Sequence, residues 1–193
     1  MLTIVVAKPS ALQSPCLSCK MLYGSTCCEI KNNSPQFPMT YGEASRIAKY
    51  TNKSILDAVV MAKVPEDVEK WWKGFSPEHA DLIVEGTALY LPVIDNACVY
   101  LGPNGCTIPN TKPSSCSLFP FSRSSAGGWS VGELVQAPGI CFAQDSNNGD
   151  FYPTLQSFGE TVSHLNAVVR RRDRDARVHV AQMKKLKRKW KSR

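Results

Sequence analysis

Apolar side chains recur at helical spacing soon after residue 40. Thr40 and Glu43 stand three positions apart, the spacing of a capping box, in which each side chain bonds the backbone N–H of the other residue at the start of a helix. Apolar residues then follow at helical spacing in two groups: Ala44, Ile47 and Ala48, and Ile55, Val59 and Val60. We therefore predict two short amphipathic helices between residues 40 and 64.

A further helix is predicted after Pro65, because a proline followed by acidic residues suits the first turn of a helix. Ser76-Pro77-Glu78 indicates the start of another turn. Trp71 and Trp72 are adjacent, so their rings cannot share one face. We expect one ring to be buried and the other to be partly exposed.

Residues 88–122 contain short β-branched runs, and Pro103-Asn104-Gly105 between them predicts a hairpin or knuckle. The pattern then predicts a flexible loop over Ser122–Gly128, a strand-like run over 129–141 and a polar linker over 143–153. From Thr154 the chain is predicted to be helical to its end. The apolar positions of that helix are Leu155, Phe158, Val162, Leu165, Val168 and Val169.

The chain begins MLTIVVAKPSALQSP, where a short apolar run has no positive residue before it and is shorter than the core of a signal peptide. We expect a first strand or an extended arm in a cytoplasmic protein. No apolar run approaches the roughly 20 residues that span a bilayer, so no transmembrane segment is expected.

With 193 residues, 43% of them hydrophobic and 20% charged, the chain has the composition of a globular domain that can bury a core without disulfides. Its most distinctive residues are eight cysteines in two groups, separated by the predicted helices. They are Cys16, Cys19, Cys27 and Cys28, then Cys98, Cys106, Cys116 and Cys141. Ligands from two distant segments would pin the first segment onto the second half of the chain.

Three kinds of chemistry are open to these sulfurs. Cytosolic thiols are kept reduced, and clustered ones more often bind metal than form bridges, although an even number also permits a disulfide framework. Cys16-Leu-Ser-Cys19 has the spacing that chelates one ion from a tight turn, and also that of a redox pair. Eight thiolates could form two zinc sites, or four could hold an iron–sulfur cluster.

The adjacent pair Cys27-Cys28 complicates any single site, because neighbouring side chains of an extended backbone point to opposite faces. Either the two sulfurs bind different metals, or the backbone is tightly folded there. The segment SPCLSCKMLYGSTCCE is therefore not expected to form a complete site by itself.

Four motifs follow one another in a fixed order: the C-x2-C unit, the Cys-Cys pair, PMTYGEASRIAKY and ACVYLGPNGCTIPNTKPSSCSLFPFS. In this order of motifs, the chain resembles the zinc- or iron-chelating cysteine-cluster proteins of the CxxCxxCC, or YkgJ, type. The resemblance covers about residues 16–141 and implies that the cysteines bind metal. The family includes the larger flagellin lysine methylases, but no glycine loop for a methyl donor is evident here. Gly127-Gly128 is interpreted as a turn.

The chain departs from the family pattern near the second cysteine group. Pro109 replaces a tyrosine, Lys112 and Ser117 replace arginines, and Cys141 stands on the other side of its Pro-Gly turn. The resemblance therefore does not extend to these arginines.

Positive charge is concentrated at the end of the chain. Residues 170–193 hold twelve Lys and Arg against two Asp, so the preceding residues carry a net charge of −3 within a total of +7. Such a run can be a solvated tail, can bind RNA or DNA with release of counterions, or can contact an anionic membrane or an acidic protein. Trp190 among the lysines could stack on a base.

His79, His164 and His179 are expected to be exposed, and no hydrolase arrangement is evident.

Together these features predict an α+β protein, with a small cysteine-rich metal-binding domain of short helices and few short strands over residues 1–150. A C-terminal basic helical extension is predicted over 151–193. We expect zinc or an iron–sulfur cluster, mainly structural, bound by the eight cysteines, and a nucleic acid, other polyanion or protein partner at residues 170–193. The alternatives are an iron–sulfur enzyme of redox or methylase-like activity and a nucleic-acid-binding accessory protein, so the sequence leaves open whether the chain is an enzyme.

Overall fold

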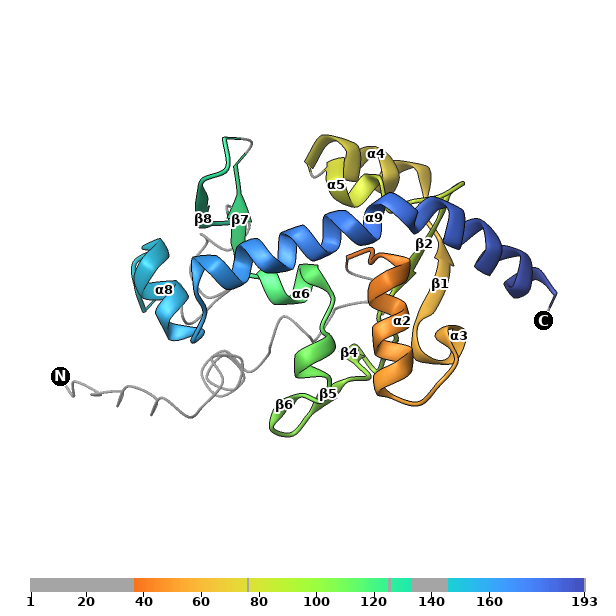
Figure 1. Cartoon of the computed structure of the whole chain (residues 1–193), viewed down its shortest axis with the longest axis horizontal. Coiled ribbons are helices and arrows are strands. Elements are labelled where there is room, and N and C mark those ends of the chain that lie inside the picture. Colours follow the sequence, from red (N-terminus) through yellow and green to blue (C-terminus); the bar gives the residue numbers. More distant parts are fainter. Residues whose placement is uncertain (1–36, 76, 125, 133–145, 193) are drawn as a thin grey trace. The chain divides into compact units, whose positions relative to one another are not determined.

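The computed structural model describes residues 37–75, 77–124, 126–132 and 146–192. The chain divides into two compact units, and each is described by itself. The first unit comprises residues 1–27 and 120–161, and the second comprises residues 28–119 and 162–193. The predicted N-terminal strand or arm and the segment SPCLSCKMLYGSTCCE lie outside the described residues. Helices and small antiparallel sheets confirm the α+β prediction (Figure 1).

The second unit holds most of the described elements. In chain order they are α2 (Tyr41–Tyr50), α3 (Ile55–Ala58), β1 (Val60–Lys63), α4 (Glu66–Phe75), α5 (Pro77–Ala80), β2 (Thr87–Tyr90), β3 (Val93–Ile94), β4 (Ala97–Cys98), β5 (Leu101–Gly102), β6 (Gly105–Cys106), the 3-10 turn η2 (Pro109–Thr111), α6 (Ser114–Leu118) and α9 (Val162–Lys191). Pairing among the described strands is antiparallel and two-stranded throughout.

The start of α2 confirms the predicted capping box. The Thr40 hydroxyl accepts a hydrogen bond from the Glu43 N–H, and the Glu43 carboxylate accepts one from the Thr40 N–H. Each bond satisfies a backbone donor that the first helical turn leaves without a carbonyl partner. The predicted apolar face of this helix is buried as well, at Ala44, Ile47 and Ala48.

The second predicted helix is shorter than expected. It ends at Ala58, and Val60 begins strand β1, which pairs with β2 in the register Val60 with Tyr90 and Lys63 with Thr87. Val60 is exposed, whereas all four residues of β2 are buried. The prediction that Val60 belongs to a helix was therefore wrong. Pairing with the buried strand β2 decides its conformation, rather than the helical spacing of the neighbouring apolar residues.

Helices α4 and α5 begin where the proline signals place them. Trp72 is 3% exposed and Trp71 is 50% exposed, which confirms the prediction for this pair. His79 does not lie in a fully exposed position: it is half-buried, and its ring centroid lies 5.0 Å from that of Trp72 and 5.5 Å from that of Phe37. His79 is less exposed than predicted because it packs beside aromatic rings. The acidic residues next to it in the sequence do not indicate this packing.

The core of the second unit gathers residues from distant parts of the chain. Apolar side chains of α2, β1 and β2 share one cluster with Cys98, Tyr100 and Ile108, and α9 contributes Met183 and Leu186 to it. The Tyr100 hydroxyl donates to the Ala58 carbonyl at 2.6 Å, which joins the β4–β5 link to the end of α3. Helix α9 packs against α2 and α6 (Figure 1). The helix that carries the basic residues is thus packed against the core of this unit through its apolar side chains.

The first unit, where described, consists of a hairpin and a helix: β7 (Phe121–Arg123), β8 (Trp129–Val131) and α8 (Phe151–Ser157). The rings of Phe151 and Phe158 meet Phe121 edge to face, at centroid distances of 5.6 and 5.7 Å. The predicted loop therefore starts after Arg123, and the predicted linker ends before Phe151. Aromatic packing stabilises both segments beyond what their polar composition indicates.

Candidate functional site

Three of the eight cysteines predicted to bind metal lie within the described residues, namely Cys98, Cys106 and Cys116. The other predicted ligands lie outside them: Cys16, Cys19, Cys27, Cys28 and Cys141. The three described cysteines belong to one unit and are carried by short elements that follow one another along the chain.

Cys98 and Cys106 each occupy the end of a tight hairpin. Asp95 and Asn96 connect β3 to β4, and both have positive φ, as the two-residue hairpin turn that matches strand twist requires. Pro103 and Asn104 connect β5 to β6, which confirms the predicted hairpin. Cys98 is buried and Cys106 is half-buried, and both pack with the same hydrophobic cluster.

Cys116 lies on α6 and is exposed. In the described parts of the chain, no three or more His, Cys, Asp or Glu side chains come together in a group that could hold a metal ion. The three described sulfurs therefore do not make up a metal site by themselves. The metal prediction depends on joining them with cysteines outside the described residues.

The carboxylate of Glu43 links the first helix of the unit to the helix that carries Cys116. Glu43 is 2% exposed; its Oε2 accepts from the Thr40 N–H at 2.8 Å and its Oε1 accepts from the Ser114 N–H at 2.6 Å. Charge-assisted hydrogen bonds of this kind are roughly twice as strong as neutral ones. One side chain thus satisfies the N-terminal backbone donors of two helices and sets the place of α6 against α2.

His179 holds α9 against the same region. Its ring is fully buried; Nδ1 accepts from the Tyr41 N–H at 2.9 Å, and Nε2 lies 3.0 Å from the Leu82 carbonyl, to which it must donate. Burial lowers the pKa of His179 below its ordinary value of 6.5, although the Leu82 carbonyl and the Glu43 carboxylate act in the opposite direction. The predicted exposure of His179 was wrong, whereas His164 is exposed as expected.

Asp175 adds a second contact between α9 and α2. Its Oδ2 lies 2.7 Å from the guanidinium of Arg46, and its carboxyl group lies so close to Gly42 that a Cβ atom there would be 2.5 Å away. A side chain at position 42 would therefore displace the Asp175 carboxyl group from its present place. Asp175 and His179 are one helical turn apart, so both contacts fix the same face of α9.

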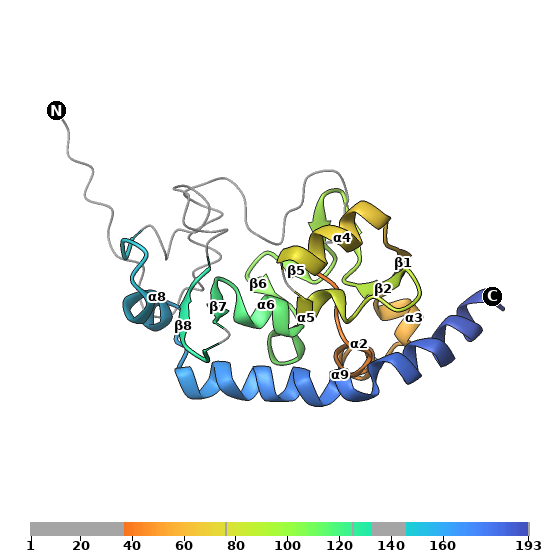
Figure 2. The ribbon, with the colours of Figure 1, turned by 90° about the horizontal axis from the view of Figure 1, so that it is seen from above.

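The face of α9 that packs on the unit follows alternating steps of four and three residues. Along it lie Leu165, Val169, Arg172, Ala176, His179, Met183, Leu186 and Trp190. Every residue from Leu165 to Leu186 in this series is buried or half-buried, and Trp190 at the end is 37% exposed. In Figure 2, α4, α6, β5 and β6 of the same unit lie on one side of α9.

The opposite face of α9 follows the same steps and carries positive charge. We define the basic ridge as the exposed series Arg170, Arg174, Arg177, Ala181, Lys184, Arg188 and Lys191. Six of its seven positions are cationic, and it extends for about 32 Å at 1.5 Å per residue. The ridge is therefore a line of charge along a helix whose other side is fixed to the protein.

Not every cation of α9 belongs to this line. Lys187 contacts the segment before β2, where its ammonium group donates to the Glu85 carbonyl at 3.0 Å and lies 3.2 Å from the Glu85 carboxylate. Lys184, which does belong to the ridge, lies 3.9 Å from the same carboxylate and remains 55% exposed. Within the described ranges, no ion pair involves Arg170, Arg174 or Arg177.

Sequence reasoning identified the basic segment but missed its geometry. The prediction placed the positive charge in residues 170–193 as a whole, whereas in the structure the steps of four and three residues through Ala181 separate the basic ridge from the buried face. Glu43 was predicted only as a helix cap, and nothing in the local sequence indicates its bond to Ser114.

Comparisons with protein-family models, with curated proteins and with solved structures found no match to this chain. The resemblance to the cysteine-cluster proteins therefore stays a prediction. Among the described helices, none is both long and apolar enough to cross a bilayer.

The lowered pKa of His179 predicts a stability that falls in mild acid. The neutral imidazole contributes fully above pH 6.5; below it the unfolded chain takes up the proton first, so the free energy of unfolding decreases as the pH falls. His179→Gln should lower that free energy by about 1–3 kcal/mol at pH 7.5, because a buried partner is left unsatisfied. It should also make the decrease between pH 7.5 and 5.5 shallower, as measured by urea unfolding.

His164→Gln, on the exposed side of the same helix, is the matched control and should leave both quantities close to the wild-type values. Equal pH dependence in wild type and His179→Gln would show that this histidine does not carry the effect. Half-buried His79, whose pKa burial also lowers, accounts for part of the slope that remains in the variant.

Proposed function

We propose that this chain is a polyanion-binding protein built on a cysteine-cluster domain. In this proposal the basic ridge contacts a nucleic acid or another polyanion, and zinc or an iron–sulfur centre held by the cysteines stabilises the fold. The observation that carries the proposal is the division of α9 into two opposite faces, one fixed to the core and one a line of exposed cations.

A line of fixed cations favours polyanions for a physical reason. Each phosphate that a Lys or Arg neutralises releases condensed counterions, so affinity depends steeply on salt. A free basic peptide would lose conformational entropy on binding, whereas α9 is already held helical by Leu165, His179 and Met183. The cations of the ridge are therefore arranged before the partner arrives.

The metal part of the proposal rests on the number and order of the cysteines and on their resemblance to the cysteine-cluster family. The elements that carry Cys98 and Cys106 are hairpins of two-residue strands, and α6 has five residues. Such short elements gain stability from cross-links, and thiolate–metal bonds supply them where disulfides do not form. Cys98, Cys106 and Cys116 are the described residues that would contribute ligands.

Neutralising part of the ridge should weaken polyanion binding without unfolding the protein. We expect the triple variant Arg170→Gln, Arg174→Gln and Arg177→Gln to bind single-stranded DNA more weakly, and to lower the slope of log affinity against log salt by about 2. Fluorescence anisotropy across a salt series measures both quantities.

The matched control removes the same charge from exposed lysines elsewhere on the unit: Lys53→Gln, Lys63→Gln and Lys70→Gln. This control should change the slope by much less than the ridge variant. If the two triple variants lost the same affinity, net charge alone would explain binding and the ridge would have no special role.

Metal removal should destabilise the chain. Protein purified without oxygen is expected to contain either about two zinc ions per chain, without colour, or iron and sulfide with visible absorption that dithionite bleaches. Combined replacement of Cys98, Cys106 and Cys116 by serine should lower the metal content measured by elemental analysis and lower the unfolding temperature.

Ser117→Ala, next to Cys116 on α6, is the control and should retain the wild-type metal content. Wild-type protein with no bound metal, or unchanged metal content in the triple serine variant, would rule out a metal role for these three cysteines. The test is independent of polyanion binding, so each half of the proposal can fail alone.

A further inference from the structure

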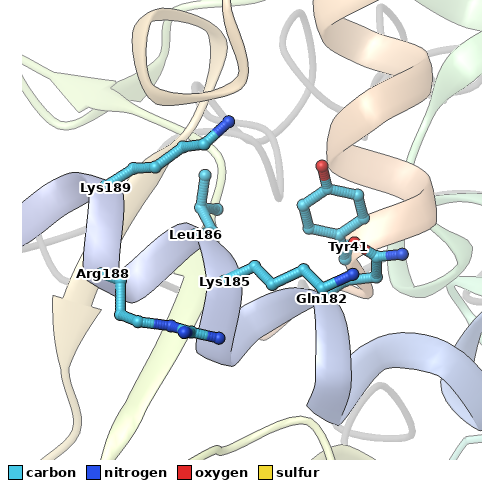
Figure 3. Close-up of a pocket in the computed structure, with 6 residues that line it drawn as sticks. All are labelled: Tyr41, Gln182, Lys185, Leu186, Arg188 and Lys189. Atoms are coloured by element: carbon cyan, nitrogen blue, oxygen red, sulfur yellow. The ribbon is translucent and has the colours of Figure 1, made fainter.

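An open pocket of about 480 Å³ lies beside the basic ridge, where the last turns of α9 pass the start of α2. Its lining consists of Tyr41, Gln182, Lys185, Leu186, Arg188 and Lys189. Figure 3 shows Lys185 and Lys189 extending from α9 on either side of Leu186, with the Tyr41 ring coming from α2. The pocket thus combines an apolar wall with cationic side chains.

The cations of this pocket are available to a ligand. Lys185, Arg188 and Lys189 are exposed, and within the described residues none of them forms an ion pair. They differ in this respect from Lys187 on the same turns, whose ammonium group is engaged by Glu85. A ligand that carries a negative charge would be bound here without breaking an existing ion pair.

The apolar wall is fixed in place before any ligand binds. The backbone N–H of Tyr41 donates to His179, its half-buried ring packs against the core cluster, and Leu186 beside it belongs to that cluster. An aromatic ring held in this way loses little conformational entropy when a planar group stacks on it. The pocket is therefore suited to a ligand that has an anionic group and a flat apolar group together.

We propose that this pocket binds one nucleotide of a single-stranded nucleic acid, with its phosphate at Lys185 and Lys189 and its base against Tyr41. The inference rests on the proposed function, since the strand would follow the basic ridge, to which Arg188 belongs. Stacking on an aromatic side chain requires an unpaired base, which favours single strands over duplexes.

Other anionic partners fit less well. A helix that lies on a membrane inserts an exposed apolar face. The exposed apolar residues of α9, namely Val178, Val180 and Trp190, do not share one face of the helix, and the basic ridge holds only Ala181 among its cations. An acidic protein segment would satisfy the charges but has no regular supply of planar rings for Tyr41. A nucleic acid strand repeats both groups at every unit.

The test separates stacking from charge by changing the probe. Wild-type protein should bind a labelled oligothymidylate of about twelve nucleotides at least about fivefold more tightly than an abasic oligonucleotide of equal length. Tyr41→Leu, which keeps an apolar side chain, should lose this preference while its binding to heparin, which has no bases, stays within about twofold of wild type. Tyr41→Phe keeps the ring and should retain the preference.

Replacing Lys185 and Lys189 by glutamine should weaken the binding of both probes and lower the salt slope by about 1.4. Circular dichroism of each variant verifies its folding, and the abasic comparison needs no variant at all. Equal wild-type affinity for the two oligonucleotides, or tighter binding to phosphatidylserine vesicles or to an acidic peptide, would overturn the inference. If wild type bound neither oligonucleotide nor heparin, the proposed function would fail with it; retention of heparin binding alone would remove only the nucleotide pocket.

Discussion

The two hydrogen bonds of the His179 imidazole set the rotation of α9 about its own axis, and the proposed function depends on that rotation. With Nδ1 bonded to Tyr41 and Nε2 bonded to Leu82, the ring joins α9 to two other segments of the unit, and Met183 and Leu186 continue the same buried face. Since a helix repeats every 3.6 residues, fixing one face fixes the other. The cations of the basic ridge face outward because His179 faces inward.

A second constraint acts at the first turn of α2, where two carboxylates lie. The Glu43 carboxylate satisfies backbone donors of α2 and α6 together, and the Asp175 carboxylate lies against Gly42 beside it. Buried polar groups that are fully paired specify one arrangement, because every alternative leaves a costly unpaired atom. The first turn of α2 thus positions both α6, which carries Cys116, and α9, which carries the basic ridge.

Local signals in the sequence predicted local structure well. The capping box at Thr40, the proline starts at Pro65 and Pro77 and the hairpin at Pro103-Asn104 are all present, because each depends on residues within a few positions. Burial of His179, strand pairing of Val60 and the Glu43–Ser114 bond depend on residues 30 or more positions away and could not be predicted in this way. The same holds for the candidate site. The basic segment could be predicted from the sequence, whereas the pocket beside Tyr41 could not, because it forms only when α2 and α9 lie side by side.

Lysine footprinting tests the central claim, that the outward face of α9 meets the polyanion, most directly. Folded protein would be acetylated with and without a single-stranded oligonucleotide, and the reactivity of each lysine measured by mass spectrometry. The account predicts that Lys184, Lys185, Lys189 and Lys191 lose reactivity when the oligonucleotide binds, while exposed Lys53, Lys63 and Lys70 keep theirs. Equal protection of both groups, or protection confined to the second group, would contradict it.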